Sequence, residues 1–296
     1  MDNMRGILLM VGAMAAFALE DMFIKRVAAD LPTGQILAFL GLGGTLAFGL
    51  AALRARSRLV SRDLLLPAVM LRNLGELIGT IGFVTALALT PLSTASAILQ
   101  ATPLAVTFGA ALFLGAEVGW RRWSAIAAGF AGVLIIIRPG LAGFEPASLF
   151  AVQGVAGLAL RDLATRRVPA KVTTVQLSAY AFAMLIVAGA FLLAIDGPAR
   201  APSPVNWRDL GFALGIGICG YWAITGAMRV GEIAVVTPFR YTRMVFALGI
   251  GALAFGERPD AATLGGAGLI IASGLYTIFR ERRLARRTLS SAPPVG

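Results

Sequence analysis

Long apolar runs separated by short polar breaks dominate the chain. We place ten such runs at residues 6–27, 33–53, 65–88, 92–114, 122–140, 146–167, 173–195, 209–228, 233–255 and 261–279. A helix needs about 20 apolar residues to cross the hydrocarbon core of a bilayer. The breaks carry proline, glycine or charged residues, which end helices or keep loops in water. The pattern predicts an all-α membrane protein with ten transmembrane helices.

Composition supports this class and excludes others. Of the 296 residues, 58% are hydrophobic and 14% are charged, whereas a typical soluble domain has about 25% charged residues. The chain has no histidine and one cysteine, which excludes histidine-based catalysis, histidine metal motifs and an intramolecular disulfide. We therefore expect no catalytic residues, no metal site and no cofactor.

Lysine and arginine are distributed unevenly between the two sides that ten spans define. An even number of spans places both termini on one side, and this side also holds the basic clusters at 54–62, 121–122, 166–171 and 280–287. The opposite side holds Lys25, Arg26, Arg138, Arg200, Arg208 and Arg258. Because basic loops stay in the cytoplasm, both termini are predicted to be cytoplasmic. The bias accounts for much of the net charge of +11, so we expect no nucleic-acid partner.

Two short sequence echoes indicate an internal repeat. Residues 18–27 read ALEDMFIKRV and residues 159–168 read ALRDLATRRV, an offset of 141. At nearly the same offset, Glu117 and Glu257 end similar segments, and we expect each to cap a short loop. A five-span unit inserts upside down the second time, which gives the inverted repeats of many secondary transporters. We therefore divide the chain into a first five-helix repeat (1–140), a second (141–280) and a basic cytoplasmic tail (281–296) that we expect to be disordered.

These features resemble the drug/metabolite transporter superfamily and, more narrowly, the EamA-type permeases. The resemblance is carried by two five-span halves, by Lys25-Arg26 at the end of the first span and by the acids that close each fourth span. Within the group, the chain is similar to bacterial exporters of amino acids, including aromatic ones. The resemblance implies a multi-pass protein of the bacterial cytoplasmic membrane. The second half departs from the pattern, because it carries Arg243 where the first half has Pro103.

Several charged residues fall inside the predicted spans, where one charge costs about 2.5–3.5 kcal/mol. Arg72 and Glu76 lie four residues apart and therefore on one helix face. They either form a structural ion pair or contact the substrate. We assign to a gate or ion network the residues Glu20, Asp21, Arg72, Arg161 and Asp162.

A zwitterionic amino acid presents a carboxylate, an ammonium group and a side chain to its carrier. Arg240 or Arg243 would bind the carboxylate through paired donors, although Arg240 can also extend to the interface. Glu76 would meet the ammonium group if it is not locked to Arg72. The aromatic residues would line an apolar region, or serve packing alone. We predict a substrate site formed by Glu76, Gln100, Tyr221, Trp222, Arg240, Tyr241 and Arg243.

Small residues and one proline predict local helix geometry. Two pairs spaced by four residues are typical of surfaces where helices approach closely: Gly75 and Gly79, and Gly211 and Gly215. Pro103 removes a backbone hydrogen bond. It is expected to kink its span and to expose backbone carbonyls near position 99 to the cavity.

The leading hypothesis is a monomeric secondary carrier that exports amino acids across the cytoplasmic membrane by alternating access. No GxxxxGK[ST] motif occurs, so nucleotide hydrolysis is excluded and the drive is the substrate gradient or protons. Proton carriers would be Glu20, Asp21, Glu76 or Asp162.

The alternative is a carrier of a nucleobase, a sugar or a drug-like metabolite. An intramembrane enzyme is disfavoured because GxSxG and histidine are absent, and a channel because the buried charges are of mixed sign. Direction and coupling stay open.

Overall fold

Helices form all the regular structure of the described chain. The computed structural model describes residues 2–54, 62–115, 118–169 and 171–290, which contain α-helices and short 3₁₀ helices but no strand. Inside a bilayer no water is available to the backbone, and a helix satisfies its own N–H and C=O groups. Apolar runs of this length therefore fold as helices, and the predicted all-α class is confirmed.

The helices follow the predicted spans closely. The first half contains α1 (Asn3–Val27), α2 (Thr33–Arg54), η1 (Arg62–Leu65), α3 (Pro67–Leu89), α4 (Leu92–Leu99), α5 (Thr102–Phe113) and α6 (Trp120–Ile137). The second half contains α7 (Ser148–Thr165), α8 (Thr174–Asp196), α9 (Pro204–Val230), α10 (Ile233–Val236), η2 (Thr237–Tyr241), α11 (Thr242–Phe255) and α12 (Ala261–Ser290). Each predicted span overlaps one helix or one broken set of helices.

Seven stretches of the described chain are long and apolar enough to cross a membrane by length and composition. The predicted spans 65–88, 146–167 and 233–255 are not among them. The first two contain charged pairs, which lower their mean hydropathy. The third is interrupted near Pro238, so that α11 has only 14 residues. The total of ten spans stays a prediction.

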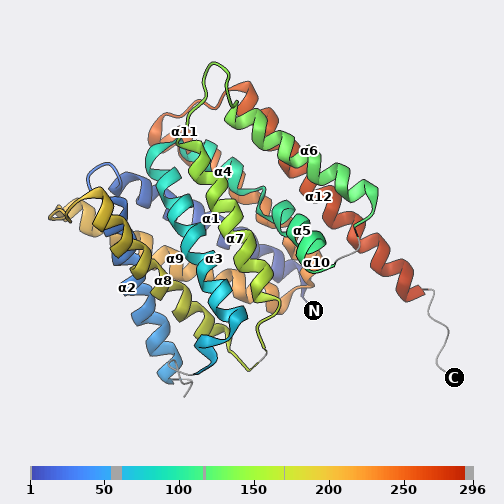
Figure 1. Ribbon diagram of the computed structural model, residues 1–296, viewed down its shortest axis with the longest axis horizontal. Helices are drawn as coiled ribbons and strands as arrows, with labels where there is room; N and C mark the ends of the chain where they lie inside the picture. Colours follow the sequence, from blue (N-terminus) through green and yellow to red (C-terminus); the bar gives the residue numbers. More distant parts are fainter. Residues whose placement is uncertain (1, 55–61, 116–117, 170, 291–296) are drawn as a thin grey trace.

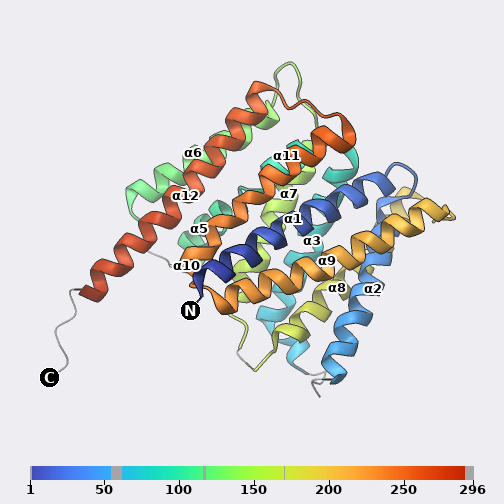
Figure 2. The same cartoon turned by 180° about the vertical axis from the view of Figure 1, so that it is seen from behind.

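Each of the main helix–helix contacts joins a helix of the first half to a helix of the second half. The main contacts join α1 to α9, α3 to α7, α2 to α8 and α6 to α12 (Figure 1). A shift of 141 residues carries α1 onto α7 and α3 onto α9, so the first two interfaces are equivalent. Figure 2 shows the N-terminus and the last turns of α12 at the same end of the bundle. This pattern is the one expected if a twofold axis related the two halves.

The helix of the fourth predicted span is broken in both halves. The first break separates α4 from α5 at Gln100 and Ala101, immediately before Pro103. The second is the 3₁₀ segment η2, which contains Pro238. The kink predicted from Pro103 is confirmed. The Leu99 carbonyl, expected to face a cavity, instead accepts a hydrogen bond from the Thr102 hydroxyl at 2.7 Å, which satisfies the oxygen that the break leaves free.

The two predicted small-residue surfaces differ in outcome. A Cβ atom placed on Gly75 would lie 2.5 Å from the backbone nitrogen of Arg161, and one on Gly79 would lie 2.8 Å from that of Leu158. The close approach of α3 to α7 is therefore confirmed. On α9, no described residue lies within 4 Å of such a Cβ on Gly211 or Gly215, so the prediction is wrong there. The sequence spacing defines a helix face but not the direction in which that face points.

Helix α12 continues beyond its predicted span and ends at Ser290. The expectation of a disordered tail is therefore wrong for residues 281–290. Leucine, alanine, arginine and glutamate fill much of this segment, and all four have high helix propensity. Residues 291–296 lie outside the described part of the chain.

Glu257, which follows α11, caps the first turn of α4 in the other half. One carboxylate oxygen accepts a hydrogen bond from the Leu92 backbone nitrogen at 2.6 Å. The other accepts hydrogen bonds from the Ser93 backbone nitrogen at 2.9 Å and from its hydroxyl at 2.7 Å. A cap of this kind stabilises by about 0.5–2 kcal/mol. Glu257 thus acts as a cap, as predicted, but of a helix in the opposite repeat; Glu117 lies outside the described residues.

Lys25 holds the end of α3 in the same region. Its ammonium group donates hydrogen bonds to the carbonyl oxygens of Leu87, at 3.2 Å, and Thr90. A positive charge is favourable at the C-terminus of a helix, where unpaired carbonyls concentrate negative charge. The loop between α3 and α4 is therefore fixed by a cation on one side and by the Glu257 carboxylate on the other.

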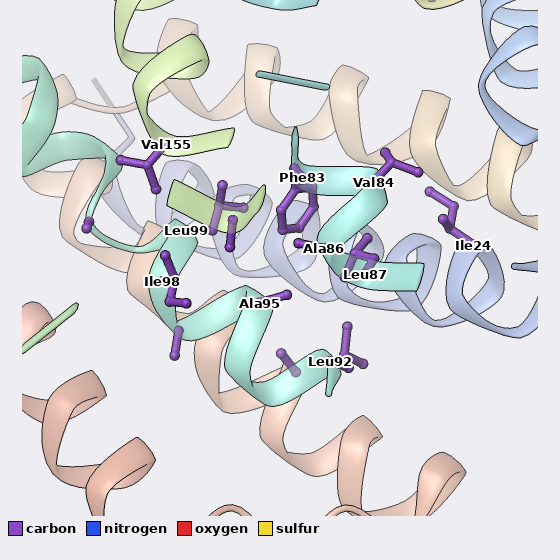
Figure 3. Close-up of a cluster of buried hydrophobic side chains, with 14 of the residues drawn as sticks. Ile24, Phe83, Val84, Ala86, Leu87, Leu92, Ala95, Ile98, Leu99 and Val155 are labelled. Carbon is purple, nitrogen blue, oxygen red and sulfur yellow. The ribbon is translucent and has the colours of Figure 1, made fainter. Parts of the chain in front are cut away.

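The main hydrophobic core lies directly beneath this loop. Figure 3 shows Phe83 and Leu87 of α3 beside Leu92 of α4, with Ile24 from α1 and Val155 from α7. All five are buried. The core thus contains residues of both halves and packs against α4, the first segment of the broken helix in the first half.

The α3–α7 contact yields a matched stability test. A Cβ atom on Gly157 of α7 would lie 2.2 Å from the backbone nitrogen of Gly79, and overpacking of this kind costs about 1–3 kcal/mol. We expect Gly157→Ala to lower the melting temperature in detergent. Gly215→Ala, on the open face of α9, should leave it unchanged or raise it slightly, since alanine favours a helix by about 0.5–1 kcal/mol over glycine. Equal stability of the two variants would contradict the close packing of α3 on α7.

Candidate functional site

The charged residues inside the bundle form two clusters. The Arg243 cluster contains Glu20 and Asp21 of α1 and Arg243 of α11. The Arg161 cluster contains Arg72 and Glu76 of α3 with Arg161 and Asp162 of α7. The sequence identified every member of both clusters, but it paired only Arg72 with Glu76.

An ion pair between Asp21 and Arg243 is the centre of the first cluster. An Arg243 terminal nitrogen (Nη2) donates a hydrogen bond to Asp21 Oδ2 at 2.6 Å, and the Asp21 side chain is buried. The guanidinium carbon lies 5.6 Å from the ring centroid of Phe17 and 5.3 Å from that of Phe83, within the range of cation–π attraction. Arg243 Nε is buried and has no hydrogen-bond partner among the residues that the structure describes. The guanidinium therefore keeps one unused donor between two aromatic rings.

The two broken helices meet next to this pair. The Gln100 side-chain amide, at the break between α4 and α5, donates a hydrogen bond to the backbone carbonyl oxygen of Arg240 in η2 at 3.4 Å. The two positions are 140 residues apart, close to the repeat offset. The charge of Arg240 interacts with those of Asp162, Arg161 and Arg243. Arg240 therefore links the two charged clusters at the point where the halves meet.

Glu76 is held by arginines on two helices. Its carboxylate lies 3.4 Å from Arg72 Nη2 and 3.5 Å from Arg161 Nη1, and Arg161 also pairs with Asp162 at 2.8 Å. Asn73, which the sequence analysis did not single out, accepts a hydrogen bond from Arg72 at 3.2 Å. Glu76 was predicted to bind a substrate ammonium group only if it did not pair with Arg72. In this structure its carboxylate pairs with both Arg72 and Arg161. The Arg161 cluster has the geometry of a structural ion network.

The aromatic residues proposed for the site do not gather around it. The Tyr221 hydroxyl lies 2.8 Å from the Ser178 hydroxyl, within hydrogen-bonding distance. The Trp222 side chain is 74% exposed, because neighbouring residues of a helix point about 100° apart. The Tyr241 hydroxyl lies against Gly274 of α12.

The rings of Phe17 and Phe83 lie against the Arg243 guanidinium instead. Phe17 precedes Asp21 by one helical turn and therefore shares its face of α1, a spacing that would have allowed its identification. Nothing in the sequence near Phe83 distinguishes it from other apolar residues of its span.

A cavity of about 470 Å³ lies at the end of the bundle opposite the N-terminus. Its polar lining includes Lys25, Arg26 and Asp30 of α1 and the loop that follows it, and Asn206 and Asp209 of α9. Arg26 and Asp209 form an ion pair across it at 3.1 Å. Lys25 lies one turn beyond Asp21 on the same face of α1. The cavity therefore lies one helical turn from the Arg243 cluster.

Comparison with known proteins identifies the family. The EamA-like transporter family matches the chain twice, over residues 4–138 and again over residues 146–279. The chain belongs to this family. The family therefore occurs twice in tandem along the chain, which is consistent with an internal repeat. This EamA-like protein is thus a multi-pass membrane transporter of small molecules and not an enzyme.

Curated relatives of this EamA-like transporter carry different solutes in different directions. The S-adenosylmethionine uptake transporter of Rickettsia bellii is 25% identical, over 72% of this chain and 73% of its own. The pseudopaline exporter of Pseudomonas aeruginosa is 27% identical, over 90% and 93%. The riboflavin transporter of Vibrio cholerae is 29% identical, over 64% of each chain.

A solved crystal structure has the same fold as this EamA-like chain. It superimposes with a TM-score of 0.60 at 19% identity, and the match covers 96% of this chain and 99% of the other. At this identity the likeness shows the fold alone.

The Asp21–Arg243 pair is testable by a double-mutant cycle. Removal of one partner from a buried ion pair strands the other charge and costs about 3–5 kcal/mol. We expect Asp21→Asn and Arg243→Gln each to lower the thermal stability of the purified transporter. The double variant should lose less stability than the sum of the two single variants. Strictly additive losses would show that the two side chains do not interact.

Proposed function

We propose that this chain is a secondary carrier that exports amino acids across the bacterial cytoplasmic membrane by alternating access. The observation that carries the proposal is the Asp21–Arg243 ion pair beside the junction of the two broken helices. Discontinuous helices near the membrane midplane form the substrate sites of many transporters with inverted repeats. In the proposed topology ten spans cross the membrane, both termini are cytoplasmic and the carrier is a monomer surrounded by lipid.

An amino acid is chemically suited to this ion pair. Its carboxylate would accept hydrogen bonds from Arg243, whose Nε has no partner within the described part of the chain, and its ammonium group would bind Asp21. An unsatisfied buried donor costs about 1–3 kcal/mol, which the incoming carboxylate would recover. Because the substrate supplies one charge of each sign, neither protein charge is left alone when the pair opens. Phe17 and Phe83 would cover the substrate side chain, which favours aromatic and large aliphatic amino acids.

The relatives extend the substrate class rather than narrow it. S-adenosylmethionine carries an α-amino acid group, so its uptake transporter handles a molecule with the charges proposed here. Riboflavin carriers are also related, and this observation supports the alternative substrate class of another small organic solute. Because the relatives include an uptake transporter and an exporter, we attribute direction to the driving gradient rather than to the fold.

Counterflow in proteoliposomes tests the proposed function. Vesicles loaded with an unlabelled amino acid should take up the labelled compound only when they contain the protein. Arg243→Ala and Asp21→Ala should lower the initial rate at least tenfold, equivalent to about 1.4 kcal/mol of lost substrate interaction. Arg258→Ala, which removes an exposed arginine outside the cluster, serves as the matched control and should retain the wild-type rate. Equal uptake by empty and protein-containing vesicles, across several amino-acid classes, would overturn the proposal.

A further inference from the structure

The cavity of about 470 Å³ at the end of the bundle opposite the N-terminus, here called the vestibule, has a lining whose charges balance. Its volume falls within the range of small-molecule sites, about 300–1,000 Å³. The charged residues of the lining are Lys25, Arg26, Asp30 and Asp209. Two are positive and two are negative. A ligand with one charge of each sign suits such a lining, because it adds no net charge.

Asn206, in the first turn of α9, presents an amide without a partner to the vestibule. The residue is only 5% exposed. Its backbone nitrogen donates a hydrogen bond to the Ser203 hydroxyl at 3.1 Å, but its side chain makes no hydrogen bond with the part of the chain that the structure describes. Buried side-chain amides nearly always have a partner. An asparagine amide both donates and accepts hydrogen bonds, so it can serve a ligand in the vestibule.

The other polar groups of the lining divide into those that are occupied and those that are available. Both oxygens of the Asp209 carboxylate are occupied, since Oδ2 lies 3.1 Å from Arg26 Nε and Oδ1 lies 2.8 Å from Arg208 Nη2. The terminal nitrogens of Arg26 donate no hydrogen bond to a described residue. The exposed Asp30 carboxylate forms no ion pair within residues 2–54, 62–115, 118–169 and 171–290. The vestibule therefore offers donors from Arg26 and an acceptor from Asp30.

Contacts between the two halves fix the walls of the vestibule. The backbone carbonyl oxygen of Asp30 accepts a hydrogen bond from Arg200 Nη1 at 3.2 Å. The backbone of Arg200 in turn exchanges two hydrogen bonds with the Gln35 side chain, at 2.8 and 2.7 Å. The loop after α1 is thus tied to the connection between α8 and α9. A cavity that is already formed loses little conformational freedom when a ligand binds.

We propose that the vestibule binds an amino acid at a second site, separate from the Arg243 cluster. In this site the carboxylate accepts hydrogen bonds from Arg26 and Asn206, and the ammonium group binds Asp30. The side chain of the amino acid lies against the apolar part of the lining, which includes Phe255. The proposal rests on the proposed carrier function and adds a station between the Arg243 cluster and one face of the membrane.

Equilibrium binding distinguishes the two sites. Purified transporter in lipid nanodiscs is titrated with labelled phenylalanine, and the amount bound per chain is measured. We expect two molecules per chain for the wild type. Arg243→Ala should bind one molecule, because it alters the central site and leaves the vestibule intact.

The vestibule variants remove one binding group each. Asn206→Leu replaces the amide by an apolar group of similar size and should weaken binding at the second site about tenfold or more, as expected for a lost hydrogen bond to a charged group. Asp30→Asn changes an exposed residue and should weaken it about threefold, as for a partly exposed ion pair. This variant decides the question if Asn206→Leu fails to fold. Arg258→Ala, which changes an exposed arginine outside the lining, should bind as the wild type does.

The outcomes separate the second site from the carrier function. If the wild type binds one molecule per chain, and Asn206→Leu or Asp30→Asn binds it equally well, the vestibule site is overturned even where counterflow is observed. If both variants weaken binding as expected but the wild type shows no counterflow, the vestibule site is supported and the carrier function fails.

Discussion

The fold depends on how opposite charges are held together inside an apolar helical bundle. An ionised side chain without a partner is costly in hydrocarbon, and the chain places Asp21 and Arg243 in contact at 2.6 Å. This contact joins the first helix to the start of α11, directly after the break in η2. It therefore fixes the irregular backbone of one half against a regular helix of the other. A ligand that carries both charges is the natural competitor for such a pair.

The two halves share a packing plan but differ in charge. Equivalent glycines bring α1 to α9 and α3 to α7, and each half breaks its fourth span near a proline. The α3–α7 interface contains the Glu76–Arg161 ion pair, whereas at the α1–α9 interface the Glu20 carboxylate lies against Gly217. The two interfaces therefore share their helix packing and differ in the charged side chains that line them.

The sequence predicted features that depend on composition and missed those that depend on helix orientation. Pro103 removes a backbone donor wherever it lies, so the break before α5 was predictable. Tyr221 and Trp222 are adjacent, yet the Tyr221 hydroxyl lies 2.8 Å from the Ser178 hydroxyl and the Trp222 side chain is 74% exposed, because neighbouring residues of a helix point about 100° apart. Arg243 and Asp21 were both recognised as costly charges, but 222 residues separate them and only the fold pairs them.

The central claim is that the junction of the two broken helices is a site reached alternately from both sides of the membrane. Cysteine accessibility tests it directly, because Cys219 is the one cysteine of the chain and Cys219→Ser removes the background. Gln100→Cys in that variant should react with a membrane-impermeant maleimide applied to either face, and a transported amino acid should slow both reactions. Reaction from one face only, with or without substrate, would contradict the account.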